Sequence, residues 1–536
     1  MTDYLLLIAV AILCCLALYK LSDRMGIPVL LAFIFLGIAF GTDGILRIDF
    51  DNYALTEQVC SVALIFIIFY GGFGTRLAEA RSIVGQATLL STLGVVVTAG
   101  LTAWFCHGVL GFSWGEGWLA GAVLSATDAA SVFSILRMKR LNLKYHTASL
   151  LEVESGSNDP IAYMLTMSCI GVILGTGGTT QILGLLASQL CIGGLAGFLF
   201  ARGAGWLLKR VHLPSGFTMA LVVAITILAY ALPTWFGGNG YLSVYLLGIG
   251  LGNVDFVDKR ALVHFFDGVT DLMQMAVFFA LGLLAFPSRL PEVFIPALCI
   301  GLFITLAARP AMVFALMAPF RAPLRQCMLV SWAGLRGASS MVFMTMAMLA
   351  VDPTSDLFHM VFLVVLGSIL FQGTLLPWIA RHLDMIDAKE DVMKTFSDYS
   401  ETTPVKFLGS ILRADHPWCG CTLNHIQMPP CTIIALIQRG PEFIIPTGST
   451  TLKADDRIVL CAKTTEDLEG VRFEEKKLEP GDKMVGKPLS ELSMEKRRLV
   501  IMVQREDRTI IPKGSTVLAE GDVLVITVLD QDTLLE

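Results

Sequence analysis

The stretch LEVESGSNDPIAYML, residues 151–165, places three acids in a segment that continues into the apolar residues of a membrane helix. Ser155, Asn158 and Asp159 are spaced i, i+3 and i+4, so they share one face of that helix. An ionisable group inside a membrane costs at least about 2.5 kcal/mol on insertion scales, so its presence indicates a function. This face offers oxygen ligands for an alkali cation and a carboxylate that can take a proton instead.

Pro160 follows Asp159 and removes a backbone donor, which frees the carbonyl group four residues earlier. The alternative interpretation is that these polar residues only begin a helix at the cytoplasmic surface. Glu152 fits that alternative best, because it lies nearest the basic residues of 137–144.

The composition supports a membrane protein with a water-soluble end. The 536 residues are 55% hydrophobic and 16% charged, whereas soluble domains carry about 25% charged residues. Of the 39 Lys and Arg, 20 lie before residue 382 and the other 19 lie after it. The net charge of −6 gives no sign of a nucleic-acid partner, and the 12 cysteines show no disulfide framework.

A hydrocarbon core about 30 Å thick needs about 20 apolar residues per helix. By that measure the chain has thirteen candidate spans, starting near residues 4, 28, 55, 84, 117, 146, 181, 216, 240, 262, 292, 327 and 357. Segments after odd-numbered spans hold fifteen Lys and Arg, and those after even-numbered spans hold only Arg47 and Arg289. Since basic residues gather on the cytoplasmic side, we expect the N-terminus outside and the C-terminus inside.

Two further spans contain charges. The fifth reads SATDAASV, with Thr127 before Asp128, and small polar residues there favour an unwound stretch whose carbonyls face an ion. The alternative is that Thr and Ser bond back to their own helix and Asp128 only caps a half-helix. The twelfth reads SWAGLRGASSMVF, and a buried Arg336 needs a carboxylate partner, for which we expect Glu154. Arg309 lies nearer a span end and is expected to reach the membrane surface.

The fifth and twelfth spans lie seven apart, as expected if spans one to six repeat with inverted topology as spans eight to thirteen. Both are interrupted by small residues, which is typical of an ion site near the membrane midplane. The positions alone support this repeat.

Three motifs in these spans resemble the NhaP-type branch of the cation/proton antiporters: ATD at 126–128, ESGSND at 154–159 and GLRGAS at 334–339. The resemblance covers about residues 1–385. It implies an all-α fold of about thirteen transmembrane helices, crossed discontinuous fifth and twelfth helices, a homodimer and elevator-like alternating access.

The resemblance also implies residue roles. Asp159 corresponds to the aspartate that binds the cation and the proton, and Asn158 precedes it as in electroneutral members. Thr127, Asp128 and Ser155 match further ion-site positions, and Glu154 and Arg336 match a structural ion pair. This chain departs from some relatives in the third span, where Phe69-Tyr70-Gly71-Gly72 replaces a Phe-Glu-Gly-Gly stretch, so potassium and sodium both stay open as cargo.

Exchange would follow from competition at Asp159. Burial disfavours the charged form of a carboxyl group and a nearby cation favours it. Cation binding then expels the proton, and protonation expels the cation. With a neutral Asn158 beside a single titrating acid, we expect electroneutral exchange; a second titrating acid at Asp128 is the alternative that would change the count.

The last part of the chain contains an internal repeat. IIPTGSTTLKADDRIVL at 444–460 matches IIPKGSTVLAEGDVLVI at 510–526, and the β-rich runs at 432–439 and 499–506 precede them. The unit resembles the TrkA C-terminal (RCK-C) domain, here in tandem. We expect a membrane domain at 1–385, a linker at 386–404 and α+β RCK-C-like domains at 405–470 and 471–536.

This resemblance implies a small ligand-sensing, dimerising module found on potassium-handling proteins. Cyclic di-AMP or an adenine nucleotide is a family-level candidate for its ligand, and no Gly-x-Gly-x-x-Gly fingerprint accompanies it. The segment HPWCGCTLNH carries His416, Cys419, Cys421 and His425, which could bind zinc. Its Cys-x-Cys spacing favours an ordinary β-turn instead.

Two other classes of protein fit the sequence less well. A potassium channel regulated by such a tail would need a TVGYG-like filter, which the chain lacks. A membrane enzyme would need a nucleophile–base pair or metal cluster, and the eight His are dispersed with no HExxH motif. We therefore expect no enzyme and no cofactor, but a multi-pass antiporter of the cell membrane that exchanges potassium, or alternatively sodium, for protons in ion and pH homeostasis.

Overall fold

A computed structural model describes residues 2–386 apart from short gaps, the longest at 78–82, 137–140 and 352–355, and residues 405–529 with further gaps. Two units make up the chain, Met1–Glu401 and Thr402–Glu536. The expected linker, the loop residues Arg76 and Arg81, and residues 137–140 of the basic run lie outside the described residues.

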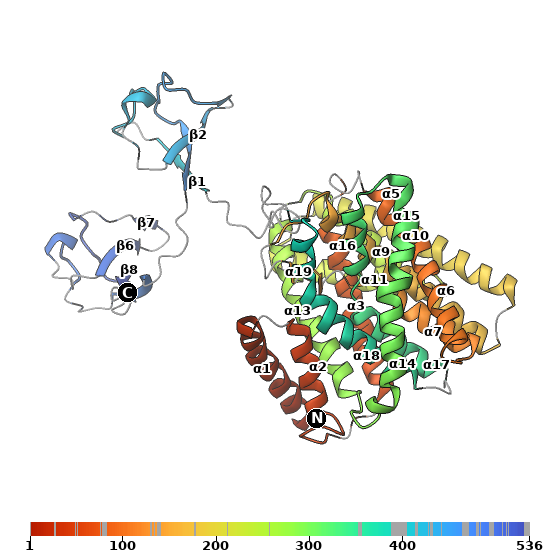
Figure 1. Ribbon diagram of the computed structural model, residues 1–536. Helices are drawn as coiled ribbons and strands as arrows, with labels where there is room; N and C mark the ends of the chain where they lie inside the picture. The colour runs from red at the N-terminus through yellow and green to blue at the C-terminus, as the bar shows by residue number, and fades with distance from the viewer. Residues whose placement is uncertain are drawn as a thin grey trace. The chain divides into compact units, whose positions relative to one another are not determined.

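The first unit is helical (Figure 1). Its helices are α1 (Thr2–Met25), α2 (Val29–Phe40), α3 (Tyr53–Gly74), α5 (Val84–Ser91), α6 (Leu93–Gly108), α7 (Trp114–Ser125), α9 (Thr147–Ile173), α10 (Thr179–Arg210), α11 (Ser215–Trp235), α12 (Gly240–Gly252), α13 (Lys259–Leu283), α14 (Leu290–Phe303), α15 (Arg309–Met317), α16 (Leu324–Trp332), α17 (Ala338–Ala350), α18 (Leu357–Gly367) and α19 (Thr374–His382).

A helix begins within three residues of each of the thirteen expected span starts. Some spans consist of consecutive helices: π-helical turns at Ile304–Ala308 and Ser368–Gly373 join α14 to α15 and α18 to α19. Among the described residues, seven helical stretches are long and apolar enough to cross a membrane by length and composition. The fold class is confirmed, and the number of crossings stays a prediction.

The fifth and twelfth spans are interrupted and touch each other, as expected. The chain is extended at Ala126 after α7 ends, and residues 334–337 are non-helical between α16 and α17. The Asp128 N–H donates to the Leu335 carbonyl oxygen at 2.8 Å. Gly337 allows this approach, because a Cβ there would lie 2.5 Å from that of Asp128.

A Gly-x-Ser-x-Gly sequence lies at the N-terminus of α7, and its serine has a structural role there. GFSWG at 111–115 has the Gly-x-Ser-x-Gly spacing of serine hydrolases. However, Ser113 caps α7 by accepting from the Glu116 N–H, while the Glu116 side chain accepts from the Ser113 N–H. This reciprocal pair is a capping box, so Ser113 has a structural role.

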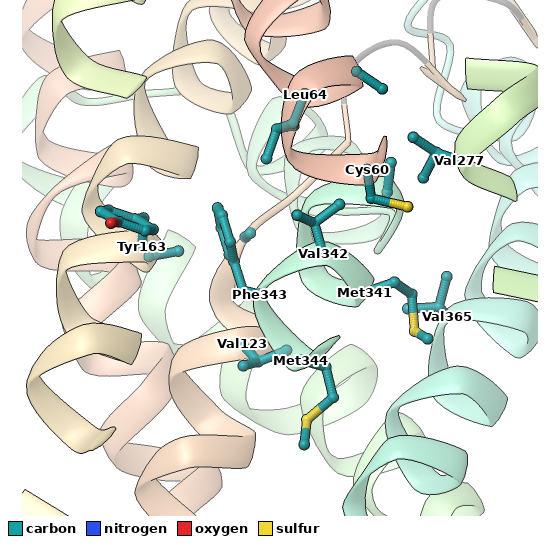
Figure 2. Close-up of a cluster of buried hydrophobic side chains, with 14 of the residues drawn as sticks. Cys60, Leu64, Val123, Tyr163, Val277, Met341, Val342, Phe343, Met344 and Val365 are labelled. Carbon is teal, nitrogen blue, oxygen red and sulfur yellow. The ribbon is translucent and has the colours of Figure 1, made fainter. Parts of the chain in front are cut away.

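The core of the membrane unit lies where α3, α7, α9, α17 and α18 meet. Figure 2 shows Leu64 of α3, Tyr163 of α9, and Val342 and Phe343 of α17 in this buried cluster. Helix α12 packs closely on α3 at Gly248, where a Cβ would overlap the Phe69 carbonyl oxygen. Small residues allow such close packing, which is how membrane helices gain contact.

The second unit contains two four-stranded antiparallel sheets. The first, in the order β1-β4-β2-β3, comprises Val405–Ile411, Arg457–Lys463, Thr432–Arg439 and Glu442–Ile444; the second, β5-β8-β6-β7, comprises Val471–Lys477, Val523–Leu529, Arg498–Arg505 and Arg508–Ile510. The strands of the second sheet follow those of the first at one constant offset along the chain. Both sheets have a bulge at the equivalent place, at Ile434/Leu436 and Val500/Met502. The predicted repeat is therefore structural.

Each sheet has the same buried ion pair. Arg439 donates from Nε and Nη2 to the two carboxylate oxygens of Asp456, both at 2.7 Å. Arg505 and Asp522 repeat this arrangement at 2.8 Å. Both aspartates have no exposed surface, so each needs the arginine to offset its buried charge.

The Cys/His segment forms a turn of the first sheet domain. The His416 ring accepts from the Trp418 N–H at 3.2 Å, and the His425 ring contacts the Thr422 hydroxyl at 2.7 Å. Within the described ranges, no three His, Cys, Asp or Glu residues come together as metal ligands do. These local contacts favour the β-turn interpretation of the segment.

Candidate ion-binding site

Helix α9 carries the centre of the site. Asn158, Asp159 and Ser155 are buried on it, and Glu154 is 1% exposed. Glu152 lies in the second turn and is also buried, so it lies inside the helix and does not begin it, as the alternative interpretation expected. The helix instead begins at Thr147, after the left-handed His146.

The interruption after α7 is bound to α9 by three polar side chains. The Asn158 amide donates to Thr127 Oγ1 at 2.5 Å and accepts from the Thr127 N–H at 3.4 Å. The Ser155 hydroxyl donates to the Thr127 carbonyl oxygen. Thr127, Ser155 and Asn158 therefore form one network, which gives hydrogen-bond partners to the Thr127 N–H and carbonyl group in the non-helical stretch.

Asp159 lies next to the start of α17. The Ser339 hydroxyl donates to Asp159 Oδ2 at 2.7 Å, and Ser339 lies in the first turn of that helix. The positive end of the helix dipole therefore faces the carboxylate. Asp159 Oδ1 is buried and has no hydrogen-bond partner among the described residues. One carboxylate oxygen is thus held in place and the other is left for a ligand.

The sequence alone did not assign a role to Ser339. The residue ends the GLRGAS motif, in which the arginine was the expected functional residue. A polar residue just after the interruption of a membrane helix was the available signal, because first-turn hydroxyls point toward whatever faces the helix N-terminus.

Asp128 lies at the crossing of the two interrupted spans. It accepts from the Ser131 hydroxyl at 2.5 Å and from the Ser131 N–H at 3.2 Å, as a residue that starts a helix does. It is close enough to Asp159 for their charges to interact. Asp128 therefore adds negative charge near the site while its own oxygens are engaged with Ser131.

The expected pairing of Glu154 with Arg336 differs from the structure. Glu154 instead forms a two-fold ion pair with Arg309, at 2.7 Å from Nη1 and 3.0 Å from Nη2. Arg309 is 3% exposed and does not reach the membrane surface. Its guanidinium group passes over Gly334, where a Cβ would lie 2.5 Å from Nε. This pairing corrects both expectations about the arginines.

Arg336 has a different role in the same region. Its Nη1 donates to the Ala126 carbonyl oxygen at 3.0 Å, and its backbone N–H donates to the Ser368 hydroxyl at 3.0 Å. Ala126 directly follows α7, so the positive charge lies at the negative end of that helix dipole. Arg336 thereby joins the twelfth span to the end of the fifth.

Comparison with known proteins agrees with this geometry. The transmembrane domain family of the sodium/hydrogen exchangers matches residues 8–382, and the TrkA-C domain matches residues 410–466 and 474–534. The K(+)/H(+) antiporter NhaP of Alkalimonas amylolytica is 33% identical over 467 residues, covering 86% of this chain and 81% of the relative. NhaP2 of Shewanella oneidensis is 35% identical, covering 85% and 79%.

A solved structure has the same fold. The sodium proton antiporter MjNhaP1 of Methanocaldococcus jannaschii aligns with a TM-score of 0.62 and 22% identity, over 70% of this chain and 97% of that one. The family match covers more than half of the chain, and the predicted resemblance is confirmed for both units. The chain therefore belongs to the sodium/hydrogen exchanger family, a family of membrane transporters rather than enzymes, and carries a tandem TrkA-C tail.

Proposed function

We propose that this protein exchanges a monovalent cation, potassium in preference to sodium, for protons, and that Asp159 carries each in turn. The observation that carries the proposal is the state of this carboxylate. One oxygen is held by Ser339, the other is buried without a protein hydrogen bond among the described residues, and both lie where the interrupted spans meet. A cation or a proton can occupy the second oxygen, but the two compete for the same charge.

The neighbouring groups support one-for-one exchange. Asn158 carries no charge and its amide is engaged with Thr127. Glu154 and Arg309 neutralise each other at 2.7 Å, so neither is available to follow the transported ion. Asp128 is another acid near the site, and its two oxygens accept from Ser131. Asp159 is therefore the group whose charge changes in this proposal, and one proton then replaces one cation.

Potassium is favoured by the relatives and by the tail. Two relatives, 33% and 35% identical to this chain, are named as K(+)/H(+) antiporters, and the TrkA-C resemblance implies potassium handling. Sodium is the alternative cargo. Tyr70 occupies the position at which some relatives carry an acid. Its hydroxyl donates to the Asp267 carboxylate of α13 at 2.8 Å, so a carboxylate from another helix lies next to this position.

We further propose the arrangement in the cell. The basic residues favour a cytoplasmic C-terminus and an N-terminus outside. The protein acts as a homodimer, and the tail regulates transport by binding a small ligand, with an adenine nucleotide or cyclic dinucleotide as the candidate class. Alternating access follows from movement of α9 and α17 as one body against α3 and α12.

A proteoliposome assay tests the proposal. Dissipation of a pH gradient is measured on adding potassium, sodium or lithium, for the full chain and for a chain without residues 390–536. Asp159→Asn should abolish the cation-driven signal, since the amide holds neither a proton nor a cation's charge. Glu292→Gln, which changes an exposed acid at the start of α14, should leave the signal intact. Retained exchange in Asp159→Asn would refute the assignment.

A further inference from the structure

The two sides of the membrane unit can be distinguished from the contacts of residue 384 and its neighbours. Lys144, just before α9, forms a 3.1 Å ion pair with Asp384, and the Lys144 backbone N–H donates to the Met385 carbonyl oxygen at 2.8 Å. Helix α9 therefore begins on the side where the chain leaves toward the tail. We call this the tail side, and the opposite one the far side.

Three aromatic rings close the site on the far side. Tyr163 lies one helical turn after Asp159, and Phe343 lies one turn after Ser339. Tyr163 contacts Phe343 at 5.9 Å and Tyr241 of α12 at 5.1 Å between ring centroids. Figure 2 shows the rings of Tyr163 and Phe343 next to each other. All three side chains are at most 9% exposed. We call Tyr163, Tyr241 and Phe343 the far-side seal.

An acid lies beside this seal. Helix α3 begins on the far side, where Tyr53 packs edge-on against Phe358 at the start of α18. Glu57, in the second turn of α3, is half-buried and accepts from the Ser61 hydroxyl at 2.7 Å. It lies close enough to Tyr163 and to Tyr230 of α11 for their charges to interact. No Lys or Arg of the described residues forms an ion pair with Glu57.

A buried hydroxyl completes the cluster. The Tyr241 side chain has no exposed surface, and its ring lies 4.9 Å from that of Tyr230 between centroids, with Ser61 nearby. Its hydroxyl forms no hydrogen bond of normal geometry among the described residues. A buried hydroxyl without such a bond costs about 1–3 kcal/mol. Because the Tyr241 hydroxyl lies near Ser61, whose own hydroxyl donates to Glu57, its position points to a bound ligand.

We propose that Glu57, Ser61, Tyr230 and Tyr241 form a second binding site for the transported monovalent cation, against the outer face of the seal, to which Tyr241 also belongs. One carboxylate and three hydroxyls are the oxygen ligands that such ions prefer. The inference rests on the proposed function, because the site lies on the transport pathway of the exchanged cation.

The helices that carry these residues explain how the second site would pass a cation to Asp159. Tyr163 and Phe343 belong to α9 and α17, the helices that hold Asp159 and Ser339, whereas Glu57 and Tyr241 belong to α3 and α12. Movement of the first pair of helices against the second separates Tyr163 from Tyr241. The seal then opens and Asp159 faces the cluster, so a cation held by Glu57 passes to Asp159 without crossing apolar core.

Transport measured from each side separately tests this inference. Vesicles are sorted by whether added protease removes the tail, and the half-saturating potassium and sodium concentrations are measured on each side. Glu57→Gln should raise this concentration at least five-fold on the far side and change it less than two-fold on the tail side. Glu57→Asp should restore most of the far-side affinity, and Glu292→Gln should match the unchanged protein. Tyr241→Phe, which keeps the ring and removes only the hydroxyl, should raise the far-side value in the same direction.

The outcomes separate the two proposals. Equal changes on both sides, or no change on the far side in both Glu57→Gln and Tyr241→Phe, would overturn the second site while leaving exchange by Asp159 intact. If the unchanged protein shows no exchange of cations for protons, the proposed function itself fails. Should Glu57→Gln not fold, the Tyr241→Phe measurement decides.

Discussion

The ion pair between Glu154 and Arg309 gives the sharpest energetic prediction. Charges about 4 Å apart attract by about 4 kcal/mol at an effective dielectric constant of about 20. The two short contacts, at 2.7 and 3.0 Å, lie in a region where both side chains are at most 4% exposed. Removing one partner of such a pair leaves the other charge buried, so Arg309→Met should lower the free energy of unfolding by about 3–5 kcal/mol.

A double-mutant cycle tests the pairing against the one expected from sequence. Glu154→Gln combined with Arg309→Met should recover much of the loss, because no uncompensated charge remains, with a coupling energy of about 1.5–3 kcal/mol. Glu154→Gln combined with Arg336→Met should show coupling below about 1 kcal/mol, since Arg336 bonds the Ala126 carbonyl oxygen instead. Reversible unfolding in mixed detergent and SDS micelles gives these energies. A larger coupling with Arg336 would refute the reasoning.

The other predictions concern the carboxylate site and the tail. Ser339→Ala removes the 2.7 Å hydrogen bond to Asp159 and should raise the half-saturating cation concentration several-fold in proteoliposomes. Ser340→Ala is the control. An unchanged value in Ser339→Ala would contradict the role given to Ser339. In the tail, hydrogen bonds from Arg439 hold the pKa of Asp456 below its usual value although burial raises it. The stability from this pair is complete above the unfolded pKa of about 3.9 and is lost as the pH falls through the lower folded pKa. Arg439→Met should therefore lower the free energy of unfolding of the first sheet by about 1–3 kcal/mol at pH 7. The measurement is hydrogen exchange in β2 of the full chain, which should become faster, with the equivalent strand β6 as internal reference. Equal acceleration in both strands would contradict a local effect.

Much of the fold could be predicted because its signals are local. A bilayer demands a continuous apolar run, so hydropathy indicates where each span starts, but not where a span divides into two helices, as at α16 and α17. The face shared by Ser155, Asn158 and Asp159 follows from helical periodicity alone. The contact of Ser155 and Asn158 with Thr127 does not follow from periodicity, since 28 residues separate Thr127 from Ser155.

The partner of Glu154 could not be predicted in this way. Arg309 and Arg336 are both buried in apolar spans far along the chain from Glu154, and no local pattern selects between them. Arg309 was placed near the end of its span because a span of about 20 residues was assumed. The structure continues that helical stretch from Leu290 to Phe320 through a π-helical turn, so Arg309 lies well inside it.

The resulting distribution of charge explains why Asp159 can change its charge alone. Arg309 is balanced by Glu154, and Arg336 by the carbonyl end of α7. Among the described residues Asp159 pairs with no arginine and is stabilised by Ser339 and the first turn of α17. A fixed cation beside it would hold it permanently ionised and leave a transported ion without a charge to compensate. Because both arginines are engaged elsewhere, we propose that the ionised carboxylate needs a bound cation in addition to these contacts, and that it otherwise takes a proton.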